Sequence, residues 1–121
     1  MQDILNRNDI EALLFAFYDK AIKDPVIGHF FTEVIPINLE THIPVIADFW
    51  VSVVLNAQVY KKNVMEIHQH ISNKSTIKKE HLDQWIRLFH ATINEKYSGP
   101  NAELMKQRAA SIATLMQIKL N

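Results

Sequence analysis

Apolar residues recur at helical spacing along almost the whole of this 121-residue chain. The clearest stripe lies near the N-terminus, where apolar side chains fall at i, i+3, i+4, i+7, i+8 and i+11: Ile10, Leu13, Leu14, Phe17, Tyr18 and Ala21. Further stripes of this kind begin at Leu39, Val64, Leu82 and Met105. Sustained alternation with a period of two and internal repeats are both absent from the sequence. The pattern predicts an all-α fold and a single domain over residues 1–121.

Capping and helix-breaking residues predict where these helices begin and end. Asn8 and Asn38 are expected to cap the first two long helices, because a short polar side chain can accept a hydrogen bond from a free backbone N–H group there. Thr76 is expected to cap the long helix that carries the stripe from Leu82. Gly99 and Pro100 separate the last two helices, since glycine favours a helix end and proline the first helical position.

Composition and charge exclude several classes of protein. The 13 Lys and Arg residues balance the 13 Asp and Glu residues, so the chain lacks the basic surplus of a nucleic-acid binder. The absence of cysteine excludes disulfides and Cys-ligated metal sites, and it suits a reducing compartment. The longest uncharged stretch, near residues 49–59, is too short to span a bilayer, and the N-terminus lacks the pattern of a secretory signal. We therefore expect a cytoplasmic protein with no nucleic-acid or membrane partner.

Two of the six histidines, His42 and His68, fall on apolar stripes and are expected to point inward. His70 lies about 200° away from His68 around a helix, which argues against a metal site made from that pair. A lone inward histidine is more often a core residue satisfied by one hydrogen bond. Here, however, Tyr18 and Trp85 also point inward, and each unsatisfied buried polar group costs about 1–3 kcal/mol. A bound cofactor or buried ligand would satisfy them.

Several motifs taken together resemble the truncated haemoglobins, specifically their third group. They extend from about residue 10 to residue 113, and no one of them is specific alone. The motifs are Phe17-Tyr18, Ile27-Gly28-His29-Phe30-Phe31, His42 with Asp48-Phe49-Trp50, His68, and Trp85-Ile86-Arg87-Leu88-Phe89. The resemblance implies a truncated globin, a two-over-two helical sandwich that encloses haem b. Residues 60–64 depart from the family, which usually has a glycine and a proline there.

The resemblance also implies roles for individual residues. His68 matches the proximal ligand of the haem iron, the axial histidine that globins use generally. Tyr18, His42 and Trp85 match the distal residues that contact the bound ligand. The residues expected to line the haem pocket are Phe31, Ile46, Trp50, Ile71 and Phe89. No catalytic residue is assigned.

The function that this implies is reversible binding of O₂ and other small iron ligands, such as CO or NO, in oxygen binding or transport. A neutral imidazole binds the iron from one side, and distal donors stabilise the negative charge that develops on bound O₂. Nitric oxide or peroxide chemistry with an unidentified reductant stays open, and His42 and Trp85 would also suit a haem peroxidase. The alternative from another class is a haemless helical module that binds a partner or an apolar small molecule. An intense Soret band distinguishes a haem protein from that module.

Overall fold

The computed structural model describes residues 1–34, 38–55 and 77–120. Its elements, in chain order, are α1 (Arg7–Lys23), the short π-helical turn η1 (Phe30–Val34), α2 (Leu39–Val54), α4 (Lys79–Lys96) and α5 (Pro100–Leu120). Within these described ranges every regular element is helical, which confirms the all-α prediction.

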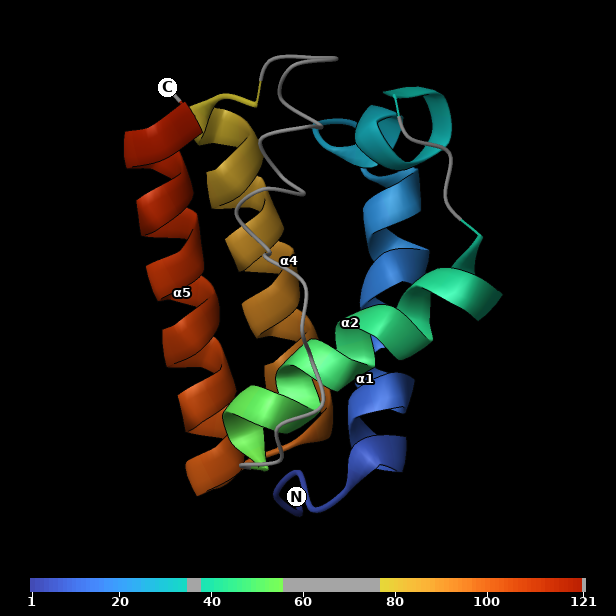
Figure 1. Cartoon of the computed structure of the whole chain (residues 1–121), viewed down its shortest axis with the longest axis vertical. Coiled ribbons are helices and arrows are strands. Elements are labelled where there is room, and N and C mark those ends of the chain that lie inside the picture. Colours follow the sequence, from blue (N-terminus) through green and yellow to red (C-terminus); the bar gives the residue numbers. More distant parts are fainter. Residues whose placement is uncertain (35–37, 56–76, 121) are drawn as a thin grey trace.

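The long helices form two pairs that lie across one another. Helix α1 packs against α2 and α4, while α5 packs against α4 and α2. Figure 1 shows α4 and α5 side by side along the longest axis of the molecule, with α2 crossing obliquely from α1 toward α5. The α1–α2 pair therefore lies over the α4–α5 pair, in the predicted two-over-two arrangement.

Helix α1 buries its predicted apolar stripe, but it begins earlier than predicted. All six stripe residues from Ile10 to Ala21 are buried. The N-cap is Asn6, whose side-chain oxygen accepts a hydrogen bond from the backbone N–H of Asp9 at 3.0 Å. The Asp9 carboxylate in turn accepts from the backbone N–H of Leu5 at 2.9 Å. The predicted cap at Asn8 is therefore wrong, because Asp9 makes a reciprocal cap with the earlier asparagine.

Two of the other predicted helix ends are confirmed. The side chain of Asn38 accepts a hydrogen bond at 2.9 Å from the backbone N–H two residues later and caps α2. The boundary at Gly99 and Pro100 separates α4 from α5, and Gly99 has a positive φ of 145°. Thr76, the predicted cap of the long helix, lies outside the described residues, and α4 itself begins at Lys79.

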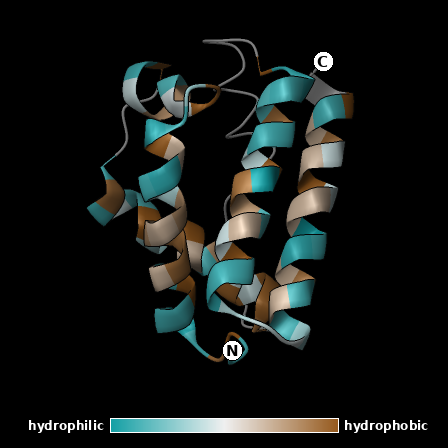
Figure 2. Cartoon of the chain, turned by 180° about the vertical axis from the view of Figure 1, so that it is seen from behind, coloured by the Kyte–Doolittle hydropathy of each residue, from teal (hydrophilic) through white to brown (hydrophobic). Residues whose placement is uncertain are grey.

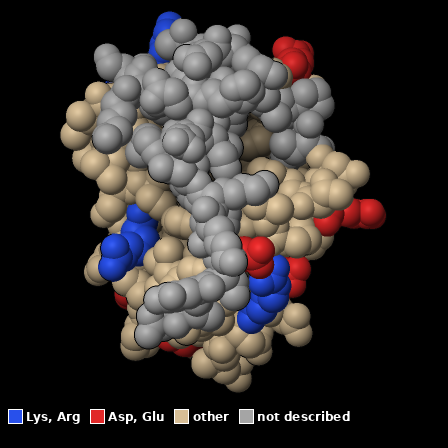
Figure 3. All heavy atoms as spheres, viewed as in Figure 1, with Lys and Arg blue, Asp and Glu red and all other residues tan. Residues whose placement is uncertain are grey.

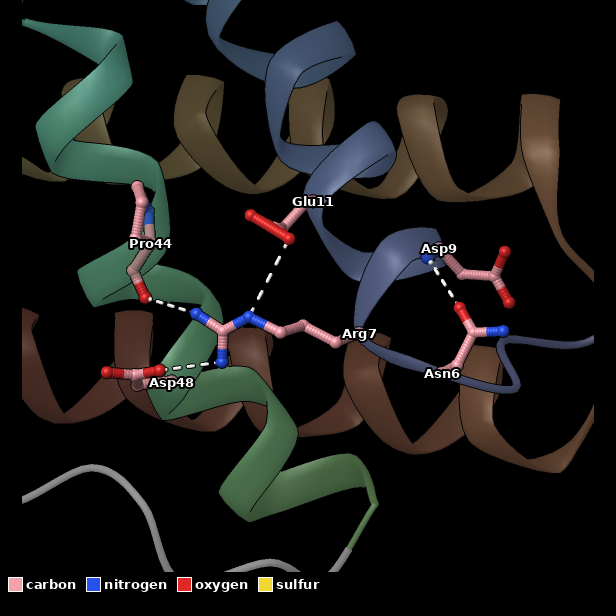
Figure 4. Close-up of polar contacts among 6 residues, drawn as sticks. All are labelled: Asn6, Arg7, Asp9, Glu11, Pro44 and Asp48. Atoms are coloured by element: carbon pink, nitrogen blue, oxygen red, sulfur yellow. Dashed lines mark hydrogen bonds and ion pairs between the residues drawn. The ribbon is translucent and has the colours of Figure 1, made fainter.

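Arg7 links the first turns of α1 to the middle of α2 (Figure 4). Its guanidinium donates to a carboxylate oxygen of Asp48 at 2.7 Å and to the backbone carbonyl of Pro44 at 2.9 Å. A third contact, at 3.6 Å, joins it to Glu11 one turn further along α1. Because the pair with Asp48 is partly exposed, its free energy is modest. The two hydrogen bonds join α1 to α2 where the helices cross.

The core lies between the helix pairs, and Figure 2 shows hydrophilic and hydrophobic residues interspersed along the helices. A few large hydrophobic side chains are exposed, among them Phe15 and Leu115. Among its described side chains, helix α5 contributes five buried residues at helical spacing: Ala102, Met105, Ala109, Ala113 and Met116. No helix in the described ranges is both long enough and apolar enough to cross a membrane. On the face shown in Figure 3, the basic and acidic side chains are scattered and do not gather by sign.

Candidate functional site

The candidate site is built around a partly buried hydrogen bond between α1 and α2. The hydroxyl oxygen of Tyr18 lies 2.9 Å from Nε2 of His42, and the two rings meet edge to face with their centroids 5.2 Å apart. Tyr18 is only 7% exposed, and its place on the inward stripe of α1 follows from helical phase. The partner of this core tyrosine is therefore a second ionisable side chain.

The electrostatic setting keeps the Tyr18 hydroxyl protonated. Burial raises the pKa of Tyr18 far above its ordinary value of 10.0, because a phenolate in this interior would lose its hydration. A protonated phenol can donate one hydrogen bond and accept others. Tyr18 therefore offers a protonated donor on an apolar wall at neutral pH.

Aromatic rings surround the pair on the side of α1 and η1. Phe31 of η1 packs edge to face on Tyr18 at a centroid distance of 5.6 Å. Phe17 packs on the other side of Tyr18 at 5.1 Å. Because these rings carry no strong donor or acceptor, they form an apolar wall beside Tyr18.

Trp85 lies in a separate aromatic stack on α4. Its indole is stacked on Phe89 at 5.8 Å with an interplanar angle of 13°, and Phe89 is stacked on Trp50 of α2 at 5.4 Å. Trp50 and Phe89 are buried, whereas Trp85 is half-buried at the end of this stack. Among the described residues, none accepts a hydrogen bond from the Trp85 indole N–H.

Phe17 connects the two ring systems. It packs edge to face on Phe89 at a centroid distance of 5.1 Å and an interplanar angle of 90°, while its neighbour in sequence is Tyr18. The sequence placed Phe17 on the inward stripe but gave no sign that it would join α1 to the α4 stack. Such a link depends on how α1 packs against α4, which helical phase alone does not specify.

The structure brings together some of the predicted site residues and leaves others outside the described ranges. Tyr18 contacts both His42 and Phe31, and a second group consists of Trp50, Phe89 and Trp85. Ile46 is half-buried and packs against the core. His68 and Ile71, the predicted proximal ligand and one pocket residue, lie outside the described residues.

A second histidine group lies elsewhere, at the start of α4. His81 accepts a hydrogen bond at 2.9 Å through Nδ1 from the backbone N–H of Lys78 and so closes the first turn of α4. The rings of His29 and Phe30 pack on it, at centroid distances of 5.7 Å and 4.9 Å. Burial lowers the pKa of His81 below 6.5, with nearby His29 and Lys78 acting in the same direction and Glu80 opposing them. His81 is thus a capping residue of α4.

The two crossed helix pairs define an all-α fold of the truncated-globin type. A curated relative, the group 3 truncated hemoglobin ctb of Campylobacter jejuni, is 26% identical over 118 residues, which cover 95% of this chain and 91% of the relative. The crystal structure of a group III truncated hemoglobin from Campylobacter jejuni matches with a TM-score of 0.85 at 25% identity and covers 100% of this chain and 96% of that one. No family model matches the chain. The comparisons confirm the predicted resemblance to group III truncated haemoglobins.

Proposed function

We propose that this chain binds haem b and reversibly holds O₂, or another diatomic ligand such as CO or NO, beside Tyr18 and His42. When bound, haem b supplies an iron atom with a coordination position that such a ligand can occupy. The observation that carries the proposal is the hydrogen bond between buried Tyr18 and half-buried His42, which places two polar groups beside an apolar wall. The likeness to truncated haemoglobins in sequence and fold supports the same function.

The described side chains suit the ligand side of a haem group. The Tyr18 hydroxyl is a protonated donor, and the indole N–H of Trp85 is a donor that no described residue uses. Donors set in an apolar interior stabilise a ligand on which negative charge develops, because little solvent competes with them. The aromatic and aliphatic side chains that we expect to contact the porphyrin are Phe31, Ile46, Trp50, Ile71 and Phe89.

We assign the axial ligand to His68. This histidine shares the apolar stripe that begins at Val64, whereas His70 falls on a polar face of the same predicted helix. A neutral imidazole is the usual axial ligand in globins. Reductive chemistry on NO or peroxide would use the same pocket with an external reductant, and a cytoplasmic location suits the cysteine-free sequence.

Haem reconstitution of the purified chain tests the proposal. One equivalent of haem should bind and give an intense Soret band, and the ferrous form should bind O₂ and CO reversibly. Failure to bind haem, with the helical fold intact, would favour the haemless module.

A matched pair of variants tests the axial ligand. We expect His68→Gly to lose haem affinity or to change the ferrous spectrum, with recovery on addition of imidazole. His70→Gly should retain the spectrum of the unmodified chain. The reverse pattern, in which His70→Gly loses haem and His68→Gly keeps it, would show that the assignment is wrong.

A further inference from the structure

Asp24 joins the segment between α1 and η1 to α4, because its two carboxylate oxygens bind in different directions. Oδ1 accepts hydrogen bonds from the backbone N–H groups of Val26 and Ile27, at 2.8 Å and 3.1 Å. Oδ2 accepts from the side-chain amide of Gln84 in α4 at 2.7 Å. Asp24 and Gln84 are both half-buried, so water competes with this hydrogen bond only in part. One side chain therefore holds the turn that follows α1 and attaches it to a second helix.

The direction of each hydrogen bond at this junction follows from the chemistry of the groups. A guanidinium can only donate, and Arg87 donates to Oε1 of Gln84 at 2.8 Å. An ionised carboxylate can only accept, so Asp24 receives its hydrogen bond from the amide nitrogen of Gln84. Desolvation by burial opposes ionisation of Asp24, but the hydrogen bonds that it accepts and the charge of Arg87 lower the pKa of that carboxyl below 3.8. The Asp24–Gln84 hydrogen bond is thus charge-assisted at neutral pH.

The turn held by Asp24 leads directly into η1. The backbone N–H of Gly28 donates to the Asp24 carbonyl at 2.9 Å, and the N–H of Phe30, the first residue of η1, donates to the carbonyl of Ile27 at 3.1 Å. Gly28 lies so close to the end of α1 that a Cβ atom there would be 2.5 Å from the carbonyl oxygen of Ile22. Any other residue at this position would displace the turn. The start of η1 is therefore held both by Asp24 and by close contact with α1.

The η1 turn places one side chain against the candidate site. Phe31 packs edge to face on Tyr18 at a centroid distance of 5.6 Å and an interplanar angle of 82°. A tyrosine ring on a fixed helix can still rotate about its side-chain torsions, and close packing of neighbouring rings restricts that rotation. On α4, Gln84 directly precedes Trp85, the other indicated donor. The Asp24–Gln84 hydrogen bond therefore links the turn that packs on one donor to the helix that carries the other.

We propose that Asp24 and Gln84 are positioning residues for ligand binding. Their hydrogen bond ties η1 to α4 and keeps Phe31 packed on Tyr18, so that the Tyr18 hydroxyl stays beside the ligand. The proposal rests on the proposed haem function, and it involves no proton transfer and no covalent step. Without this hydrogen bond the Tyr18 ring gains freedom to turn away. The loss weakens a hydrogen bond to a partly charged ligand such as O₂ and leaves a weak acceptor such as CO unaffected.

Gln84→Met is the first test, because it keeps the length of the side chain and removes the hydrogen bond to Asp24. In the haem-loaded variant, O₂ release measured by stopped flow should be about three- to tenfold faster than in the unmodified chain, with CO release unchanged. The matched control is Lys20→Met, which breaks a different link from α1 to α4, the ion pair of Lys20 with Glu95 at 2.6 Å. O₂ release should be unaltered in this control, because η1 takes no part in that ion pair.

An exchange of donor and acceptor tests the hydrogen bond itself. Asp24→Asn alone turns an NH₂ group toward either the Gln84 amide or the backbone N–H groups that Asp24 binds, and Gln84→Glu alone sets two carboxylates together. Each single variant should release O₂ faster than the unmodified chain. The double variant again sets one donor against one acceptor, with Arg87 able to bind the new carboxylate. Its O₂ release should return to within about twofold of the unmodified rate.

Ring contacts provide a readout that does not depend on ligand kinetics. In the CO complex of the unmodified chain, nuclear Overhauser effects should connect the ring protons of Phe31 with those of Tyr18. These signals should weaken in Gln84→Met, persist in Lys20→Met and return in the double variant.

Three outcomes would overturn the proposal while leaving the haem function intact. Unchanged O₂ release in Gln84→Met would show that the hydrogen bond does not position the ligand-binding group. Equal acceleration in Lys20→Met would show a general effect of lost stability. A double variant as fast as the single variants would show that the exchanged hydrogen bond is not the cause. Failure of the proposed function itself would be recognised earlier, because no Soret band would appear on reconstitution.

Discussion

Tyr18 owes its importance to the chemistry of one hydroxyl group. Helical phase alone placed this residue inside, but the identity of its partner depends on the crossing of α1 and α2. A sequence reading allows a backbone carbonyl to satisfy a core tyrosine, and the structure shows the His42 imidazole in that place. The pair could be anticipated as two inward polar residues, though not as a hydrogen bond. Such a contact depends on how α1 and α2 pack, as does that of Arg7 with Asp48, which joins residues 41 positions apart in sequence.

Tyr18→Phe should accelerate O₂ release, because the variant lacks the hydroxyl that we propose donates to the bound ligand. The lost hydrogen bond to a polarised ligand is worth about 1.5–3 kcal/mol, which corresponds to roughly 10- to 150-fold faster release. Release of CO should barely respond. Stopped-flow measurement of both ligands checks this. Equal acceleration of O₂ and CO would indicate a packing role, and no change in either would assign the donor to His42 or Trp85.

Trp85→Phe separates a donor role from a packing role on α4. Phenylalanine can keep the stacking on Phe89, so the free energy of unfolding should change by only about 1 kcal/mol. The substitution also removes the indole N–H group. O₂ release should therefore become about tenfold faster, which corresponds to the free energy of one hydrogen bond. Chemical denaturation and stopped flow measure the two effects on the same variant. A large loss of stability with unaltered ligand kinetics would show that the indole serves only the core.

At the scale of the element, the sequence predicted which face of a helix is buried better than it predicted where the helix begins. The stripes of α1 and α5 are buried largely as predicted, because helical phase determines which side chains share a face. The start of α1 was misplaced, because Asn6 and Asn8 are equally good caps by residue type. What distinguishes them is the position of Asp9, whose carboxylate can turn back to the N–H of Leu5 only when Asn6 is the cap.

Helix α4 should lose stability in acid through its capping histidine. His81 must be unprotonated at Nδ1 to accept from the Lys78 N–H, and burial lowers the pKa of His81 below 6.5. The unfolded chain therefore takes up this proton at a higher pH than the folded chain, so the free energy of unfolding falls as the pH drops below about 6.5. The expected loss is at most that of one helix cap, about 1 kcal/mol.

Denaturant unfolding at several pH values, followed by the helical circular dichroism signal, measures the slope of the free energy of unfolding against pH. His81→Gln should flatten it, because an amide oxygen can accept the same hydrogen bond without titrating. His90→Gln, on the same helix but bonded to the carbonyl of Lys106, should retain it. If the slope is the same in His81→Gln as in the unmodified chain, the cap does not control the acid response.

At the scale of the whole molecule, the N-terminal segment is fastened to the start of α5. Both carboxylate oxygens of Asp3 accept hydrogen bonds at 2.9 Å, from the backbone N–H groups of Asn101 and Ala102. The Asn101 side chain donates to the carbonyl of Ile4 at 2.6 Å, and the Ser98 N–H donates to the carbonyl of Gln2 at 3.0 Å. In the sequence, Gly99 and Pro100 indicated only that one helix ends and the next begins here. They did not indicate a contact with a residue 98 positions away.

The glycine before α5 is part of the same junction. Gly99 has a φ of 145°, and a Cβ atom there would lie 2.5 Å from Cγ of Asp3. Only glycine allows both this backbone conformation and the close approach of the carboxylate. Gly99 thus separates two helices, as the sequence indicated, and also makes room for the residue that caps the second of them.

Asp3→Asn should therefore destabilise the whole fold although the change lies three residues from the chain start. Desolvation by burial opposes ionisation of Asp3, but hydrogen bonds from the N–H groups of Asn101, Ala102 and Ile4 lower the pKa of that carboxyl below 3.8. The amide keeps one acceptor, loses the second and removes a negative charge from the positive end of a helix dipole. The expected cost is about 1–2 kcal/mol, or a fall in Tm of about 3–8 °C.

The pH dependence of this contribution has a definite sign. Because the pKa of Asp3 is lower in the folded chain, the unfolded chain binds the proton first as the pH falls. The stabilisation is thus complete well above pH 3.8 and is lost as the pH falls below that value toward the folded-state pKa. Asp19→Asn is the matched control, because its carboxylate is 71% exposed and, within the described part of the chain, pairs only with Lys23 one turn away on α1. Thermal unfolding near neutral pH should distinguish the two variants, and equal Tm values would mean that Asp3 does not fasten the N-terminal segment to α5.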